Sequence, residues 1–349
     1  MGISPNFKAI ITLKPQRERS LLRRHPWIFS GAVANIQGEA QPGETVKVLS
    51  ATGEFLAWAA YSPHSQIIAR VWSWDPHETI DEAFFYRRLS LAFAARQAYG
   101  FTRRISGQEK SLEAVRLVHA ESDGLPGLIV DSYADTLVMQ FLTAGAERWR
   151  ETLIDSCLSL SGSRWIYERS DSDVRRLEGM PERVGPLRGG EPPDQIVIHE
   201  PGPGGALRFA VDVRQGHKTG CYLDQRMNRA RVGSLACNRE VLDCFSYTGG
   251  FALHALAGGA SSVLAVDSSA EALAVARRNC TLNAFPPDRV DWTEGDVFHV
   301  LRSFRDSRRS FDLIILDPPK FAPTASQTKS AARGYKDINL LALKLLRPG

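Results

Sequence analysis

Glu240-Val-Leu-Asp243-Cys-Phe-Ser-Tyr-Thr-Gly-Gly250-Phe251 decides the fold, because this stretch leads from a short apolar strand through a glycine turn into a helix. Glycine lets a ligand approach the backbone closely, and the first turn of a helix presents N–H groups that have no partner within the helix. The next apolar stretch, residues 262–267, ends on Asp267, where an acid commonly binds ribose hydroxyls. The pattern therefore predicts a parallel α/β sheet that binds a ribose-bearing cofactor at the carboxyl ends of its strands.

Two further acids are expected at strand ends of the same region. Residues 290–296 predict a strand ending at Asp296, and residues 313–317 predict one ending at Asp317. Asp317 is followed by two prolines, Lys320 and Phe321. Prolines fix φ and lack an N–H donor, so this turn offers carbonyl acceptors, a carboxylate and a ring that can stack on a flat substrate. This inventory suits a nucleobase.

The cofactor is predicted to be S-adenosylmethionine (SAM). The spacing of glycines in residues 248–251 does not match the G-x-G-x-x-G turn of dinucleotide-binding proteins, which argues against a pyrophosphate. Three strand-end acids around one pocket disfavour a polyphosphate and suit adenosine joined to a cationic sulfonium. Alternating strands and helices from about residue 199 favour a parallel sheet, with helices from Gly250 and over 270–283 and with Ser269 as an N-cap.

Several motifs occur along the chain in an order that is typical of one enzyme family. They are residues 220–226 (Gly-Cys-Tyr-Leu-Asp-Gln-Arg), the turn after Asp243, Asp267, Asp296, residues 317–321 and residues 333–339 (Arg-Gly-Tyr-Lys-Asp-Ile-Asn). Together they resemble the class I methyltransferases that modify cytosine C5 in bacterial large-subunit (23S) ribosomal RNA. Residues 19–31 resemble the PUA domain of the same proteins. The resemblance covers nearly the whole chain and implies a SAM-dependent RNA (cytosine-5) methyltransferase that acts on rRNA.

Patterns and resemblance together give individual residues expected roles. Asp317 is expected to orient the cytosine edge, and Lys320 to neutralise a phosphate of the flipped nucleotide. A helix cap or a Lys320 ion pair is the alternative for Asp317, and a solvated side chain is the alternative for Lys320. Asp267 is expected on the ribose and Asp296 near the adenine amino group, whereas residues 224–226 are placed near the methionine end through the resemblance alone.

The predicted binding residues form two sets. The cofactor set is Asp224, Gln225, Arg226, Asp243, Phe245, Ser246, Tyr247, Gly249, Asp267, Ser268, Asp296, Val297 and Asp317. The RNA set is Lys14, Arg19, Arg23, Arg24, His25, Phe321, Arg333 and Lys336.

The nucleophile is expected outside the sequence. Cytosine C5 is a weak nucleophile, so methylation there requires a thiolate that adds to C6. The resemblance places this cysteine in a Ser-Cys-Ser-type turn after Gly349, so the chain is expected to be truncated and inactive. Cys244 is the best internal substitute, although burial would raise its pKa, and Cys221 ranks below it. Two alternatives stay open: an exocyclic-nitrogen or guanine rRNA methyltransferase, which needs no thiol, and a non-catalytic RNA-binding protein with a SAM-domain fold.

The chain of 349 residues is long enough for two or three domains. Residues 1–78 are expected to form a PUA-like RNA-binding β-barrel, with strands at 9–13, 44–49, 55–58 and 66–72. Residues 79–198 are expected to form an α+β middle domain that starts with a connecting helix over 81–99 and continues with strands at 128–130, 136–141 and 165–167 and a helix near 146–160. Residues 121–127 are assigned a turn. Residues 199–349 are expected to form a Rossmann-like class I methyltransferase domain, incomplete at its C-terminus.

Composition and charge add limits. The net charge of +4 is only mildly basic, but the cations of residues 8–24 stand against Glu18 alone and lie beside Trp27 and Phe29, which are expected in the barrel core.

Five cysteines without a C-x-x-C pair indicate neither a zinc site nor a disulfide framework. No apolar run is long enough for a membrane span and no signal peptide is evident, which favours the cytoplasm. A homodimer is left open.

Overall fold

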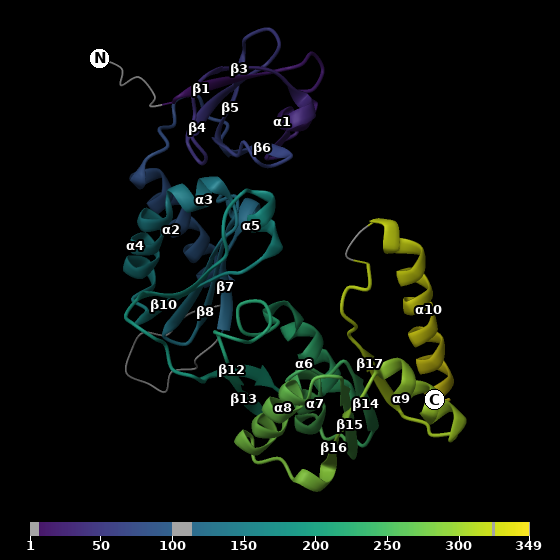
Figure 1. Cartoon of the computed structure of the whole chain (residues 1–349). Coiled ribbons are helices and arrows are strands. Elements are labelled where there is room, and N and C mark those ends of the chain that lie inside the picture. The colour runs from purple at the N-terminus through teal and green to yellow at the C-terminus, as the bar shows by residue number, and fades with distance from the viewer. Residues whose placement is uncertain (1–6, 100–113, 323–324, 349) are drawn as a thin grey trace. The chain divides into compact units, whose positions relative to one another are not determined.

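The chain folds into two compact units in the computed structural model, which describes residues 7–99, 114–322 and 325–348 (Figure 1). Unit 1 contains Met1–Ile196 and Asp212–Cys221, and unit 2 contains Val197–Val211 and Tyr222–Gly349. The backbone therefore passes between the units at residues 196/197, 211/212 and 221/222.

The N-terminal part of unit 1 is a six-stranded sheet of order β2-β6-β5-β4-β1-β3. Its strands are β1 (Ala9–Leu13), β2 (Trp27–Phe29), β3 (Val33–Gly38), β4 (Thr45–Leu49), β5 (Phe55–Tyr61) and β6 (Ile67–Ser73), and α1 (Arg19–Leu22) lies between β1 and β2. Inward side chains such as Ile11, Val46 and Val48 are fully buried in its core. The four predicted strands are confirmed, whereas β2 and β3 were not predicted.

In its described residues, the rest of unit 1 is a five-stranded sheet of order β11-β10-β9-β8-β7 with four helices. Its elements are α2 (Glu82–Ala98), β7 (Ala114–His119), β8 (Leu128–Tyr133), β9 (Thr136–Phe141), α3 (Ala144–Arg148), α4 (Arg150–Ser161), β10 (Trp165–Ser170), α5 (Asp173–Leu177) and β11 (Arg183–Arg188). Asp81 caps α2 by accepting a hydrogen bond from the N–H of Phe84 at 2.8 Å, which confirms the connecting helix. The single helix expected near 146–160 is divided at Trp149 into α3 and α4.

Unit 2 contains a hairpin and a parallel sheet. The hairpin, which was not predicted, consists of β12 (Ile196–Gly202) and β13 (Gly205–Val211). The sheet has the order β16-β15-β14-β17 and is parallel throughout. Its elements are α6 (Arg226–Leu235), β14 (Glu240–Cys244), α7 (Gly250–Ala257), β15 (Ser262–Asp267), α8 (Ala270–Leu282), β16 (Val290–Glu294), α9 (Val297–Asp306), β17 (Leu313–Leu316) and α10 (Thr328–Leu345).

Helices cover both faces of this parallel sheet, as the alternation predicted. Val241 and Val263 pack towards the cluster that includes Ala252 of α7 and Cys280 of α8. Leu242, one residue along β14, packs into the opposite cluster with residues of α9 and α10. From β14 the chain adds β15 and β16 on one side and then returns to place β17 on the other side of β14. The point between β14 and β17 is therefore the topological switch point of the sheet. In open α/β sheets, ligands bind in the crevice at the carboxyl ends of such strands.

The expected strand end at Asp296 is wrong. β16 ends at Glu294, and Asp296 lies outside the strand as the N-cap of α9, where it accepts a hydrogen bond from the N–H of His299 at 3.0 Å. An aspartate before a helix satisfies one of the first N–H groups of that helix, which explains this placement. Among the described helices, none is long and apolar enough to cross a membrane.

Candidate functional site

The turn after β14 has an unusual backbone. Phe245 and Tyr247 have positive φ angles of 62° and 49°, a conformation that is uncommon for residues other than glycine, and Gly249 has a φ of 80°. A Cβ atom on Gly249 would lie 3.0 Å from both Ala276 Cβ and Trp292 Cη2. The turn therefore requires glycine at position 249 and holds two larger residues in a strained conformation, which is typical of ligand sites.

Asp267 holds this turn from the neighbouring strand. Its Oδ2 atom accepts a hydrogen bond from the N–H of Tyr247 at 2.8 Å, and its Oδ1 atom accepts one from the N–H of Ser269 at 2.9 Å. Ser269 in turn caps α8 by accepting from the N–H of Ala272, which confirms the predicted N-cap. A carboxylate has about four acceptor positions, so Asp267 keeps capacity for ribose hydroxyls.

Asp243 is a fully buried carboxyl group at the end of β14. Its Oδ2 atom accepts from the N–H of Ala252 at 3.1 Å, while its Oδ1 atom has no hydrogen-bond partner among the described residues. Burial raises the pKa of Asp243 to about 8, the charges of Asp317 and Asp267 add to this rise, and the hydrogen bond from Ala252 opposes it. The hydroxyl of buried Ser246 also lacks a partner in the described part of the chain.

These features fit SAM. Two buried polar atoms have no partner among the described residues and are available for hydrogen bonds. The glycine turn allows close approach of the backbone, and the group of acids supplies the negative charge that suits a nucleoside with a sulfonium.

Asp317 lies in the same electrostatic environment as Asp243. It directly follows β17, whose Leu316 is in register with Cys244 of β14. Although Asp317 is exposed, partial desolvation raises its pKa, the charge of Asp224 acts in the same direction, and Arg229 opposes it. The pKa of Tyr222 is raised by burial and by Asp317, Asp224 and Asp267. The structure therefore brings the acids of three motifs, Asp224, Asp267 and Asp317, together around Tyr222.

Phe321 is half-buried and contacts other aromatic rings. Its centroid lies 4.5 Å from that of Tyr335 and 5.7 Å from that of Phe298. The hydroxyl of Tyr335 donates to the carbonyl of Pro319 at 3.4 Å and accepts from the N–H of Phe321 at 3.3 Å. Tyr335 of α10 thus fixes the Asp-Pro-Pro-Lys-Phe turn.

The remaining predicted residues of unit 2 differ in their exposure. Lys320, Asp224, Ser268, Asp296, Arg333 and Lys336 are exposed, and Phe245, Tyr247, Gln225 and Arg226 are half-buried. The Val297 side chain is buried in the core, so only its backbone is available for a ligand. Cys244 is 1% exposed, and its burial together with the charge of Asp243 raises the pKa of its thiol. Cys244 is therefore a thiol and not a thiolate at neutral pH.

A buried cluster behind the site was not predicted. Glu200 of β12 accepts two hydrogen bonds from Arg229 of α6 at 2.7 Å each, and it lies 3.0 Å from Nε2 of His254 of α7. Burial pushes the pKa of Glu200 upwards, but the hydrogen bonds and charges of His254 and Arg229 prevail and lower it to about 2. The spacing of Arg226 and Arg229 along one helix face was the available signal, and their acidic partner is remote in sequence.

The predicted RNA residues of unit 1 are all exposed. Lys14 donates to the carbonyl of Gly31 at 3.1 Å, and the Arg24 guanidinium lies 5.3 Å from the ring centroid of Trp74. His25, Trp27 and Phe29 form a row of rings with centroid distances of 5.6 and 6.4 Å. The expectation that Trp27 and Phe29 belong to the barrel core is wrong: Phe29 is 48% exposed, and half-buried Trp27 donates its ring N–H to Glu121 at 2.8 Å. An aromatic row therefore lies among the cations.

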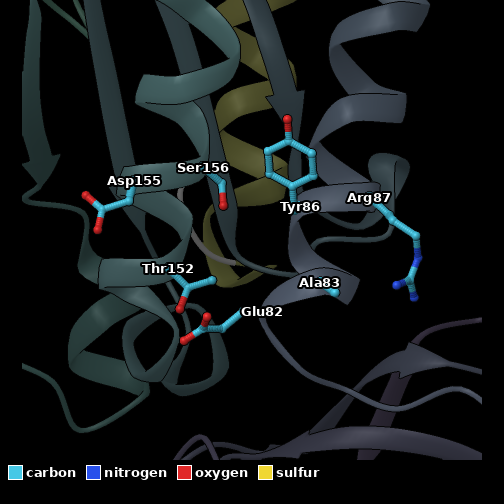
Figure 2. A pocket seen from close by; sticks show the side chains of 7 residues that line it. All are labelled: Glu82, Ala83, Tyr86, Arg87, Thr152, Asp155 and Ser156. Atoms are coloured by element: carbon cyan, nitrogen blue, oxygen red, sulfur yellow. The ribbon is translucent and has the colours of Figure 1, made fainter.

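A hollow of about 550 Å³ opens between α2 and α4 (Figure 2). Its lining comprises Glu82, Ala83, Tyr86, Arg87, Thr152, Asp155 and Ser156. The predicted cofactor and RNA residues do not line it. Within residues 7–99, 114–322 and 325–348, no group of three or more His, Cys, Asp or Glu residues is arranged to hold a metal ion.

Comparisons with known proteins agree with this geometry. A PUA-like domain family matches residues 11–74, and the family described as S-adenosylmethionine-dependent methyltransferase matches residues 165–349. The ribosomal RNA large subunit methyltransferase I of Shewanella amazonensis is 49% identical over 339 residues, and that of Escherichia coli K12 is 48% identical over the same length. Each alignment covers 97% of this chain and 83% of the relative.

Solved structures share the fold. A chain from Streptococcus mutans, assigned to the SAM-dependent methyltransferases, is 21% identical with a TM-score of 0.79 and covers 97% of this chain and 83% of its own. A methyltransferase structure that contains SAH is 22% identical with a TM-score of 0.81 and covers 98% and 83%, respectively. With its PUA-like and SAM-dependent methyltransferase domains and its extensive identity to the curated relatives, this chain belongs to the family of ribosomal RNA large subunit methyltransferase I.

Proposed function

We propose that this protein transfers the methyl group of SAM to C5 of a cytosine in large-subunit rRNA. The relatives are named for large-subunit rRNA, which supports the substrate class. The observation that carries the proposal is the pairing of β14 and β17, because this pairing sets the Asp243 turn beside Asp317 and its two prolines. One strand end offers a cofactor site and its neighbour offers groups that suit a flat base.

The proposed cofactor contacts combine these positions with the family resemblance, which alone places residues 224–226 at the methionine end. Asp267 accepts from the ribose hydroxyls, Asp296 lies near the adenine amino group, and the turn of residues 245–249 presents its backbone to the nucleoside. Asp224, Gln225 and Arg226 bind the methionine end. The polar atoms of Asp243 and Ser246 that have no partner in the described part of the chain complete the hydrogen bonding. SAM supplies the electrophilic methyl group.

The proposed base contacts centre on Asp317. As a carboxylate it accepts from N4–H of cytosine, and in its protonated form it donates to N3; partial desolvation raises its pKa, which favours the protonated form. Lys320 is exposed beside it and neutralises a phosphate of the flipped nucleotide. Phe321, Arg333 and Lys336 extend the RNA contacts of unit 2, and the cations of residues 14–25 bind RNA on unit 1.

The thiolate that this chemistry requires is proposed to come from a cysteine after residue 349. It would add to C6, and C5 of the resulting enamine would take the methyl group from the sulfonium, which leaves as S-adenosylhomocysteine. Loss of the C5 proton to solvent would then eliminate the thiolate from C6. Cys244 does not suit this role, because its burial and raised pKa keep it protonated and inaccessible.

The decisive experiment uses the protein in its full natural length with SAM and rRNA labelled with tritium at cytosine C5. We expect one tritium released per methyl group transferred, and 5-methylcytidine by mass spectrometry of the nucleosides. Methylation without tritium release would overturn the C5 assignment, and an N-methylated or guanine product would identify the other enzyme class. Tight RNA binding without any methyl transfer would support a non-catalytic RNA-binding protein.

Two further parts of the proposal concern the state of the protein. We propose that it acts in the cytoplasm, where rRNA is its substrate, and a homodimer is the oligomeric state to be tested. Sedimentation equilibrium of the purified protein tests the dimer, and a mass equal to one chain at micromolar concentration would contradict it.

A further inference from the structure

Residues 212–221 belong to unit 1, although the residues on both sides of them belong to unit 2. The guanidinium of Arg169 on β10 donates to the carbonyls of Val213 at 3.0 Å and Gly216 at 3.1 Å, which fixes the start of this segment. Its end is fixed on β8 by a buried chain of hydrogen bonds. We call residues 212–221 the anchored segment.

The hydrogen bonds at the end of the anchored segment run in one direction. The hydroxyl of Thr219 donates to Oδ2 of Asp131 at 2.6 Å. Because a hydroxyl has a single proton, the 2.8 Å contact between Thr219 and Tyr133 requires Tyr133 to donate. The phenol oxygen of Tyr133 then accepts from the N–H of Cys221 at 3.3 Å. The carboxylate of Asp131 can only accept, so the direction of both hydroxyl hydrogen bonds is defined.

Burial makes this arrangement strong. Asp131 and Tyr133 are 0% exposed, and Thr219 is 1% exposed. Arg116 compensates the carboxylate of Asp131 with two hydrogen bonds of 2.8 and 2.9 Å. Burial, with the charges of Cys221 and Asp131, raises the pKa of Tyr133 well above its ordinary value, so its hydroxyl stays a donor. Loss of one hydroxyl would leave a buried polar group without its partner, which is costly.

The anchored segment leads directly into the cofactor site. Tyr222 follows Cys221, and its ring meets Tyr247 of the β14 turn edge-to-face with centroids 5.5 Å apart. Asp224 lies two residues further on. We propose that Thr219 and Tyr133 are positioning residues for SAM binding: they fix the backbone at residue 221 and thereby the placement of Tyr222 and residues 224–226. This inference rests on the proposed role of residues 224–226 at the methionine end.

Thr219→Val tests the proposal, because valine keeps the shape and removes the hydroxyl. We expect the Kd for SAH, measured by calorimetry without RNA, to rise about tenfold, which is equivalent to about 1.4 kcal/mol. Thr219→Ser, which retains the hydroxyl, should restore wild-type affinity. The matched control is Thr143→Val, since Thr143 is 4% exposed and its hydroxyl donates to Pro126 and accepts from Ala146, outside the anchored segment.

The outcomes separate positioning from general stability. Similar losses of Tm in both valine variants, with weaker SAH binding in Thr219→Val alone, would support the proposal. Unchanged SAH affinity in folded Thr219→Val, or equal weakening in both variants, would overturn it. Tyr133→Phe provides a second test: hydrogen exchange at the Cys221 amide should become faster and SAH binding weaker. Methylation of rRNA by the wild-type protein is measured separately, so a failure of this inference is distinct from a failure of the proposed function.

Discussion

Asp243 combines complete burial with a polar atom that has no partner among the described residues, and this makes the stability of unit 2 sensitive to pH. The pKa of Asp243 is raised to about 8 in the folded protein, against about 4 in an unfolded chain. Between these two pKa values Asp243 is protonated in the folded state and ionised in the unfolded chain. The free energy of unfolding therefore falls by about 1.4 kcal/mol for each pH unit of increase in this range. The contribution is fully retained below about pH 4 and lost as pH rises through about 8.

Asp243→Asn should remove this slope. Without SAM, we expect the Tm of the variant to rise relative to wild type as the pH increases from about 5 to about 8. Thermal unfolding at several pH values measures the difference. Parallel pH profiles for the two proteins would contradict the protonated state of Asp243.

Gly249 permits a second prediction at the level of one residue. Gly249→Ala places a Cβ atom 3.0 Å from Ala276 and Trp292 in a left-handed conformation, so we expect it to destabilise unit 2 by about 2 kcal/mol or more and to weaken SAM binding. Gly204→Ala is the matched control, because its φ of 79° imposes the same backbone strain but no atom lies within 4 Å of the new Cβ. Equal effects of the two substitutions on denaturant unfolding would show that the close packing at Gly249 is unimportant.

Among the elements, the β12–β13 hairpin is joined to α6 and α7 by Glu200. Its pKa of about 2 lies below that of an unfolded glutamate, so its charge contributes stability that is present above about pH 4.5 and lost as pH falls towards 2. Glu200→Gln leaves the buried Arg229 guanidinium without its counter-charge and should cost about 3 kcal/mol at pH 7. Glu240→Gln, at a side chain that is 47% exposed and paired with Arg347, should change the free energy of unfolding by less than about 1 kcal/mol. A urea titration that ranks the two variants in the reverse order would refute this.

The elements that the sequence predicts well are those with local signals. Local signals identified the turn after Asp243, the strand to Asp267 and the Ser269 cap. The apolar pattern of each strand, the glycines of the turn and the capping residue lie next to one another in the sequence. β3 and the β12–β13 hairpin were missed, because their stability depends on partners elsewhere in the chain. The Glu200–His254 contact spans 54 residues, and the Tyr133–Thr219 contact spans 86, so neither leaves a pattern in a short window. Asp296 shows the converse: an acid after a strand can equally be a helix cap.

For the molecule as a whole, RNA binding is expected to combine charge with stacking. Arg23 is exposed on the chain that follows α1, and Phe29 lies 48% exposed at the end of the aromatic row. Arg23→Gln should lower RNA affinity and reduce the slope of log K against log[salt] by about 0.7, because one fewer counterion is released. Phe29→Ala should cost about 1–3 kcal/mol if a base stacks there, without changing the slope.

Leu22→Ala is the control for both substitutions, since Leu22 is 66% exposed in the same region and has neither charge nor ring. Fluorescence titrations with an rRNA fragment at several salt concentrations provide both affinity and slope. Wild-type affinity in both Arg23→Gln and Phe29→Ala would exclude this surface as the RNA contact.

The anchored segment also determines how the protein can be divided. A fragment that ends at residue 196 would contain Asp131 and Tyr133 but lack Thr219, so its buried carboxylate and phenol would lose their partner. A fragment that begins at residue 222 would lack the hairpin strand that carries Glu200. Cleavage at either of these two boundaries therefore does not yield two autonomous folding fragments, and the halves should regain structure only by complementation in one tube. Evolutionary recombination by simple end-to-end fusion would meet the same obstacle, so the two units are expected to be inherited together.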